Sequence, residues 1–343
     1  MAIAKDSAGI VATGCIDMTS KSVNGLETQL RRAFWGVMAS FLVHGLVVST
    51  WISRIASLKA ELKLSDGALG LALLGAAIGS ITTIPICGWL VTKYGSRRSA
   101  KWTSLGLCLA LVLPALSWNA GTLFAALLVF GALAGANDVA MNAQGVVTEK
   151  LRGTPTMSRF HAMFSLGGIL GASAGGLLAA SGISPLTHLA SGAICFLFLA
   201  ILVSGLTVET HESEPRTEKR VPIKRIPLTL VALSAIGFCI FLSEGAIADW
   251  AAVYLRQELG AGEGLAAAGY AVFSAAMALF RFGGDAITAW IGEGVDDPFG
   301  RTHRRRRFDV SRVGSIALLG AGRIRSGRNR LLVDHSAGLC SRR

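Results

Sequence analysis

Eight long apolar segments constrain the fold of this chain more than any other feature of its sequence. They lie at 33–53, 68–91, 102–118, 122–148, 162–181, 185–207, 228–253 and 265–289. Each has about 17–27 residues, which is enough for an α-helix to cross the hydrocarbon of a bilayer. None of them alternates between apolar and polar residues, as the strands of a transmembrane β-barrel do. Only 16% of the residues are charged, against about a quarter in soluble domains. We therefore predict an all-α integral membrane protein with eight spans.

The basic residues predict how these spans are oriented. The connectors after the second, fourth and sixth segments are rich in Lys and Arg, whereas those after the third and fifth contain neither. Positively charged loops stay in the cytoplasm. The N-terminus and the connectors that follow even-numbered spans are therefore expected on the cytoplasmic side.

A hydrophilic connector and a weak repeat predict how the chain is divided. We expect a cytoplasmic N-terminal segment at 1–32, a six-helix bundle at 33–208, a cytoplasmic linker at 209–226 and two further spans at 227–293. The first span ends in HGLVVSTW and the seventh contains EGAIADW, and the spans that follow them begin GALGLALLGAAIG and GLAAAGYAVFSAA. Such ordered similarity is typical of transporters whose duplicated halves surround a central site.

The segment 294–343 differs from the rest of the chain. It has twelve arginines, four aspartates and no lysine, so it carries +8 of the formal net charge of +12. Its apolar run VGSIALLGAG is too short to cross a bilayer. Three interpretations remain open: a tail that binds anionic lipid headgroups, an arm that binds nucleic acid, and sequence translated out of the ancestral frame. We favour the third, because the repeat stops after two of six expected spans.

Several segments resemble the major facilitator superfamily. GWLVTKYGSRR, from Gly88 to Arg98, is similar to the glycine-rich cytoplasmic loop of that family, with Thr92 where the family usually has Asp. DVAMNAQG, SRFHAMFSLGG and SEGAIADWAAVYL resemble the fucose-permease-like branch that includes the YbjJ-type inner-membrane proteins. The likeness covers roughly residues 33–293.

This resemblance implies a major facilitator-type bundle in a bacterial inner membrane. It implies two six-helix halves and a cavity lined by the first, fourth, seventh and tenth spans, of which the tenth is not expected here. The expected function is proton-coupled secondary transport of a small polar solute, such as a sugar or related metabolite, by a monomer. The expected partners are the solute, protons and the lipid bilayer, with no nucleic acid, cofactor or metal.

Two alternative functions stay open at this point. One is a truncated fragment or regulatory membrane protein that does not transport. A membrane-embedded enzyme is a remote alternative, because the sequence has no nucleophile–base pair, metal-ligand set or phosphate-binding loop.

The fourth span contains the first group of candidate site residues, in GANDVAMNAQG. At 3.6 residues per turn, Asp138 and Asn142 share a face with Gly131, Gly135 and Gly145. A carboxylate at the centre of a span costs roughly 2.5–3.5 kcal/mol, so Asp138 is expected to face a bundle interior or a wet cavity. We predict that it contacts solute or carries a proton. The amides of Asn137, Asn142 and Gln144 fit solute contact or hydrogen bonding between helices equally well.

The first and seventh spans contain the second group. Glu244 is the better candidate there for proton or solute coupling, while Asp249 lies beside Trp250, a residue type that anchors helices at the headgroups. His44 occupies the corresponding place in the first span and is a proton shuttle if it faces Glu244. Arg54 closes the first span, where an interfacial anchor is favoured over an anion site.

The loop between the second and third spans is the predicted cytoplasmic gating loop. Gly88 and Gly95 have the family spacing, and Arg97 and Arg98 follow them. Its basic residues fit positive-inside charge alone, but we favour a loop that clamps the second and third spans against the other half. Thr92 can cap the turn that follows but cannot pair with a cation. Five glycines of the fifth span predict a seam of close helix contact: Gly167, Gly168, Gly171, Gly175 and Gly176.

Overall fold

The computed structural model describes residues 20–207 and 228–291, and side chains from 27 to 207 and from 228 to 281. Within these residues the chain is all-helical, and eight helices are long and apolar enough to cross a membrane. This confirms the predicted fold class. The linker 209–226 and the arginine-rich segment 294–343 lie outside the described residues.

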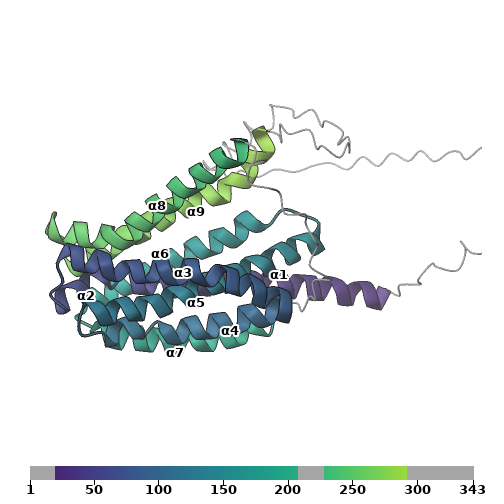
Figure 1. Ribbon diagram of the computed structural model, residues 1–343. Helices are drawn as coiled ribbons and strands as arrows, with labels where there is room; N and C mark the ends of the chain where they lie inside the picture. Colours follow the sequence, from purple (N-terminus) through teal and green to yellow (C-terminus); the bar gives the residue numbers. More distant parts are fainter. Residues whose placement is uncertain (1–19, 208–227, 292–343) are drawn as a thin grey trace, which may run out of the picture. The chain divides into compact units, whose positions relative to one another are not determined.

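Ten helical elements make up this part of the chain (Figure 1). They are α1 (Ser20–Ile52), α2 (Ile55–Glu61), α3 (Asp66–Tyr94), α4 (Ser96–Ala110), η1 (Leu113–Leu116), α5 (Ala120–Arg152), α6 (Met157–Ala180), α7 (Pro185–Ser204), α8 (Leu228–Gln257) and α9 (Glu263–Ile291). The connections after α2, η1, α6 and α8 lie at one end of the bundle, which we call the α2 end. Those between α3 and α4 and between α5 and α6 lie at the other, the α4 end.

Local signals in the sequence set where these helices begin and end. The Ser65 side chain accepts a hydrogen bond from Ala68 N at the start of α3. Asn119 and Thr122 form a capping box at the start of α5. Gly153 ends α5 with φ +66°, a left-handed conformation that suits glycine. These caps satisfy backbone groups that a helix end leaves without partners.

Small residues let the helices of the bundle approach closely. The five glycines predicted to form a seam on α6 are all buried, which confirms that prediction. A Cβ at Gly167 would overlap the carbonyl oxygen of Leu42 in α1. The same carbonyl–glycine approach joins α5 to α3, where a Cβ at Gly131 would overlap the carbonyl group of Ala76. Packing at backbone contact distance is therefore what holds these pairs together.

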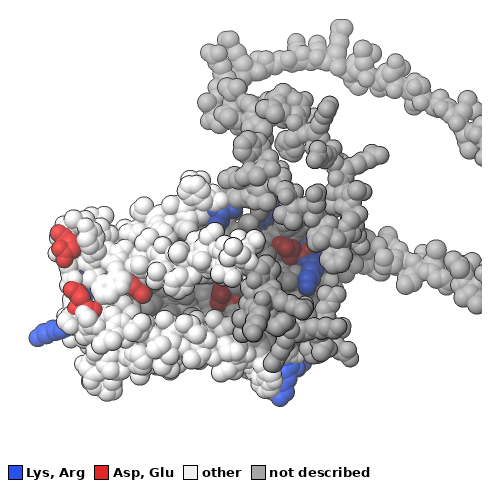
Figure 2. Space-filling view, turned by 45° about the horizontal axis from the view of Figure 1, so that its top comes forward, with Lys and Arg blue, Asp and Glu red and all other residues white. Residues whose placement is uncertain are grey.

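The helices α8 and α9 join the first six spans mainly through α6. Gly264 of α9 lies against Gly176 of α6, and Arg281 of α9 lies against Ser165, so α6 and α9 run antiparallel. Only the α2 end of α8 is covered, where Ala252 and Val253 are buried. On the face drawn in Figure 2, charged groups gather mainly at the two ends and the sides are largely uncharged, as expected of a surface that meets lipid tails.

Candidate functional site

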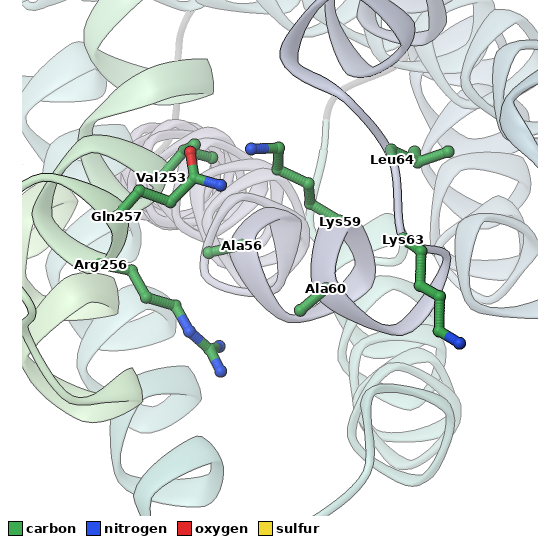
Figure 3. Close-up of a pocket in the computed structure, with 8 residues that line it drawn as sticks. All are labelled: Ala56, Lys59, Ala60, Lys63, Leu64, Val253, Arg256 and Gln257. Atoms are coloured by element: carbon green, nitrogen blue, oxygen red, sulfur yellow. The ribbon is translucent and has the colours of Figure 1, made fainter.

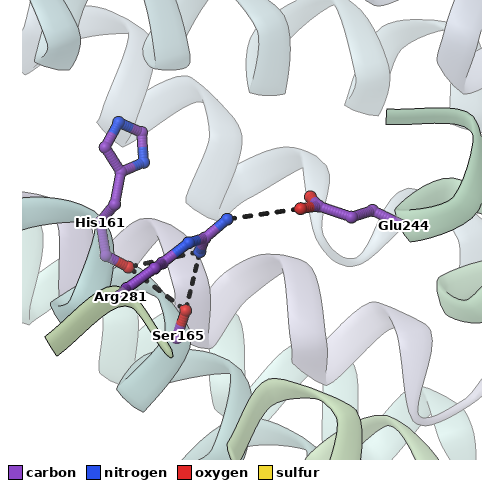
Figure 4. A network of polar contacts seen from close by, with 4 residues as sticks. All are labelled: His161, Ser165, Glu244 and Arg281. Atoms are coloured by element: carbon purple, nitrogen blue, oxygen red, sulfur yellow. Dashed lines mark hydrogen bonds and ion pairs between the residues drawn. The ribbon is translucent and has the colours of Figure 1, made fainter. Parts of the chain in front are cut away.

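An arginine of α9 joins three helices in the apolar part of the bundle (Figure 4). Arg281 Nη1 donates to Ser165 Oγ of α6 at 2.7 Å and lies 3.5 Å from the carbonyl oxygen of His161. Its Nη2 lies 3.5 Å from Glu244 Oε1 of α8. The two charged side chains are 24% and 27% exposed. An arginine and a carboxylate in a membrane span are expected to pair in this way, since each offsets the other's charge.

Sequence reasoning missed Arg281, although a signal was present. It is the only charged residue between Glu263 and Asp285, in the run AVFSAAMALFRFGG. A lone ionisable residue in an apolar span indicates a functional site by itself. Glu244 was predicted as a coupling residue, and the structure supplies the cation that it contacts.

A second polar network lies between α1, α4 and α5. Asn137 Nδ2 lies 2.8 Å from His44 Nδ1, and Thr103 Oγ1 donates to Asn137 Oδ1 at 3.1 Å. His44 is 6% exposed and Asn137 is 2% exposed. This arrangement favours the interhelical role of Asn137 over solute contact.

The structure gives His44 and Glu244 different partners. His44 bonds to Asn137 and lies against the ring of Phe164, whereas Glu244 contacts Arg281. Among the described side chains the expected facing pair of His44 and Glu244 is therefore absent. The repeat places the two residues at equivalent positions in their helices, but their side chains are held by different neighbours.

Asp138 and Asn142 form a polar pair on an open part of α5. Asn142 Nδ2 donates to the backbone oxygen of Asp138 at 2.9 Å and to its Oδ1 at 3.1 Å. Asp138 is exposed, whereas Gly131 and Gly135 are closed over by α3 and Gly145 by α6. The shared helix face is thus divided: its glycines pack against neighbouring helices and its carboxylate remains open. No other described helix covers that carboxylate.

Gln144 and the predicted gating loop meet at the α4 end. Gln144 is buried, and its Nε2 donates to Ser96 Oγ at 2.7 Å, which ties α5 to the first residue of α4. Gly95 connects α3 to α4 with φ +83°. Gly88 lies inside α3 and not in a loop, and it has no atom within 4 Å of an added Cβ, so it is not required by close packing. Arg97 is half-buried and Arg98 is exposed.

Two expectations about side chains at the helix ends, those for Thr92 and Arg54, are wrong. Thr92 Oγ1 donates back to Trp89 O, 2.8 Å away in the same helix, so it does not cap the following turn. Trp250, beside the half-buried Asp249, packs 3.5 Å from the Cβ position of Gly70 and joins α8 to α3. Arg54 is only 1% exposed, because its Nε donates to His188 Nδ1 at 2.9 Å inside the bundle. Thr92 thus bonds within its own helix, and Arg54 lies inside the bundle and not at the membrane interface.

The comparisons with known proteins agree with this architecture. The family model described as Major Facilitator Superfamily matches residues 34–321. The chain belongs to the major facilitator superfamily. It is 37% identical over 254 residues to an uncharacterized MFS-type transporter of Yersinia pestis, covering 74% of this chain and 65% of that protein. It is 34% identical over 267 residues to the uncharacterized transporter y4wD of Sinorhizobium fredii, covering 74% and 68%.

A solved transporter structure shows the same fold. The crystal structure of the nucleoside transporter NupG matches with a TM-score of 0.54 and 15% identity, covering 77% of this chain and 68% of that one. The chain thus spans about two thirds of the length of these relatives. Membership of this transporter family places the chain outside the enzymes, and eight apolar helices make it a multi-pass integral membrane protein.

Proposed function

We propose that this chain is a secondary transporter that couples a small polar solute to protons by alternating access. The observation that carries the proposal is the position of Arg281, which contacts Ser165 among the first six spans and Glu244 on α8. Arg281 thus joins an ion pair between α8 and α9 to a hydrogen bond with α6, so protonation of its carboxylate partner directly changes how these three helices are held together. Membership of a transporter family supports the transport part of the proposal.

Glu244 is the group that we assign to proton coupling. When its carboxylate is charged, it offsets the charge of Arg281 across 3.5 Å. Protonation removes that attraction and leaves Arg281 held by Ser165 and the His161 carbonyl of α6. The proton therefore changes how strongly α8 is held to α9 and α6, while α9 stays bonded to α6.

Asp138 and Asn142 are the residues that we assign to solute contact. They present a carboxylate and an amide four residues apart on α5, and the Asp138 carboxylate is open. Hydroxyl groups of a sugar or a related metabolite can donate to the carboxylate and accept from the amide. Asn137 bonds to His44 of α1 and Gln144 bonds to Ser96 of α4, so these two amides hold α5 to its neighbouring helices.

The location and the branch within the family are also part of the proposal. Relatives from Yersinia pestis and Sinorhizobium fredii favour a bacterial inner membrane. The basic residues of the α4 end, such as Arg97 and Arg98, favour its cytoplasmic placement, and with it a cytoplasmic N-terminus. The segments DVAMNAQG and SEGAIADWAAVYL favour the fucose-permease-like branch.

Transport in proteoliposomes tests the proposal. The full chain is reconstituted with a trapped pH dye, and neutral hexoses, pentoses and polyols are added in turn. We expect at least one solute to carry protons inward, and we expect Glu244→Gln to lose accumulation while it keeps exchange of pre-loaded solute. Exchange needs only the loaded carrier to reorient, whereas accumulation requires a proton to be bound and released in each cycle.

The matched control is Glu258→Gln, a change to an exposed carboxylate at the α2 end of the same region. It should accumulate solute like the wild type. Equal accumulation by Glu244→Gln and wild type would remove Glu244 from the mechanism. Uptake by the wild type without any response to a pH gradient would remove proton coupling altogether.

A further inference from the structure

A cavity of about 500 Å³ lies at the α2 end, between α2 and the last turns of α8 (Figure 3). Lys59, Lys63 and Ala60 line it from the side of α2, and Val253, Arg256 and Gln257 line it from α8. Its size falls within the roughly 300–1,000 Å³ of pockets that hold small molecules. It is separate from Asp138 and from the Arg281 network, which contribute none of its lining residues.

The charged and amide side chains that line this cavity can all donate hydrogen bonds, and none of the lining residues is acidic. Acidic residues act from outside it: Asp66 pairs with Lys59, and Glu263 Oε1 lies 2.7 Å from Arg256 Nη1. These carboxylates fix the positions of the two cations. Arg256 has further N–H groups beyond the nitrogen that contacts Glu263, so it can still bind another anion.

Lys63 supplies a third cation and has no ion pair among the described side chains. It is exposed, and it is the only non-glycine residue with a positive φ, at +52°, in the described part of the chain. Figure 3 shows the charged ends of Lys63 and Arg256 on opposite sides of Ala60. Lys59 lines the cavity from α2, and Arg256 and Gln257 line it from α8, so a ligand with several acceptor oxygens meets donors on both helices.

From this lining we infer that the cavity at the α2 end is a binding site for a small anionic group, a phosphate or a carboxylate. Lysine ammonium and arginine guanidinium groups with a nearby amide are the donor set that such oxygens require. Because α2 belongs to the first half of the chain and α8 to the second, a bound anion holds the two together at this end. This inference concerns binding alone and does not depend on transport.

Direct binding to the purified full chain tests the site. Inorganic phosphate and succinate are the soluble probes, titrated by calorimetry in nonionic detergent at constant ionic strength set with chloride. A lipid headgroup is the other source of an anionic group with acceptor oxygens. A second experiment tests it with nanodiscs of phosphatidylcholine, with or without phosphatidylglycerol, in which native mass spectrometry counts the anionic lipids that the protein retains.

The same variant, Lys63→Gln/Arg256→Gln, is used in both experiments; it removes two positive charges and keeps a polar side chain at each position. We expect it to bind the probe at least tenfold more weakly than the wild type, with an unchanged melting temperature in the absence of probe. Lys93→Gln is the matched control, because Lys93 is exposed at the α4 end and lies over the Trp89 ring. It should bind like the wild type.

The two arms distinguish the source of the anion. Saturable binding of phosphate or succinate that the double variant loses assigns the site to a soluble anion, and selective loss of retained phosphatidylglycerol assigns it to a lipid. Wild-type binding by the double variant in both arms would overturn the inference. So would the absence of saturable binding by the wild type in both.

Discussion

At the scale of single residues, the pair of Arg281 and Glu244 makes a prediction about stability. Replacing Arg281 with Met leaves a carboxylate among apolar side chains, and replacing Glu244 with Met leaves a guanidinium. Each single change should therefore cost roughly 1–2 kcal/mol of the free energy of unfolding, since both groups are about a quarter exposed. The double Met variant should be more stable than either single variant, because no unpaired charge remains.

Thermal unfolding of the three variants in detergent measures this coupling. The interaction free energy comes from the double-mutant cycle. If the losses of the two single variants simply add in the double variant, the two side chains do not interact, and the proposed link between α8 and α9 would have to be abandoned.

Asn137 and Asn142 offer a matched comparison on one helix. Asn137 is buried and bonds to His44 of α1, whereas Asn142 bonds within α5 to Asp138. Asn137→Ala should lower the free energy of unfolding by about 0.6–1.7 kcal/mol, the range of hydrogen bonds between membrane helices. Asn142→Ala should cost less, because it breaks no contact between helices. Equal losses, measured by unfolding in mixed micelles, would contradict the assignment of Asn137 to structure and Asn142 to the solute.

The sequence predicts the chemical types at these positions but not their partners. Asn137 and Asp138 are adjacent polar residues in one apolar run. They point in different directions around the helix axis, so the amide is buried while the carboxylate is exposed. Which neighbour each one meets depends on how α5 is rotated against α1 and α3. The same limit applies to Glu244, whose partner Arg281 lies on another helix, at a position set by the packing of α8 and α9.

At the scale of helices, the glycine contacts make the packing sensitive to a single methyl group. A Cβ at Gly131 would lie only 2.6 Å from the carbonyl carbon of Ala76, and backbone atoms cannot move aside as a flexible side chain can. Gly131→Ala should therefore push α5 from α3 and cost roughly 1–3 kcal/mol. Gly237 in α8 has no atom within 4 Å of its Cβ position.

Gly237→Ala is accordingly the control for that substitution. It should leave stability unchanged or raise it by up to about 1 kcal/mol, because alanine favours a helix more than glycine does. Thermal unfolding of both variants in detergent tests the difference. Equal stability of the two would mean that α3 and α5 do not meet at the carbonyl–glycine contact.

The glycine seams could be predicted from the spacing of the glycines in the sequence. The contact of Trp250 with Gly70 could not, because it joins helices that are distant in the sequence.

At the scale of the whole described unit, α8 and α9 both contact the first six spans at the α2 end. Trp250 of α8 lies against Gly70 of α3, and the Cβ position of Gly264 lies 3.0 Å from Ala180 Cβ at the end of α6. In contrast, α8 is uncovered along the residues nearer the α4 end. The proposed alternating access requires these contacts at the α2 end to separate once in every cycle.

A disulfide across this contact tests that requirement. Ala180→Cys and Gly264→Cys would bring two Cβ atoms close to the distance of about 3.5–4.5 Å that a disulfide needs. In a background without the six native cysteines, we expect an oxidant to cross-link the pair in membranes. The cross-link should abolish both exchange and accumulation, since α6 and α9 can then no longer part at this end. Reduction should restore both activities.

The pair Ala180→Cys and Gly237→Cys is the control, because Gly237 has no neighbour within 4 Å of its Cβ position. It should neither cross-link nor lose activity. A cross-linked Ala180–Gly264 pair that still exchanges solute at the wild-type rate would show that this contact stays closed throughout the cycle. The moving boundary would then lie between α8 and α3, where Trp250 meets Gly70, and α9 would move together with the first six spans.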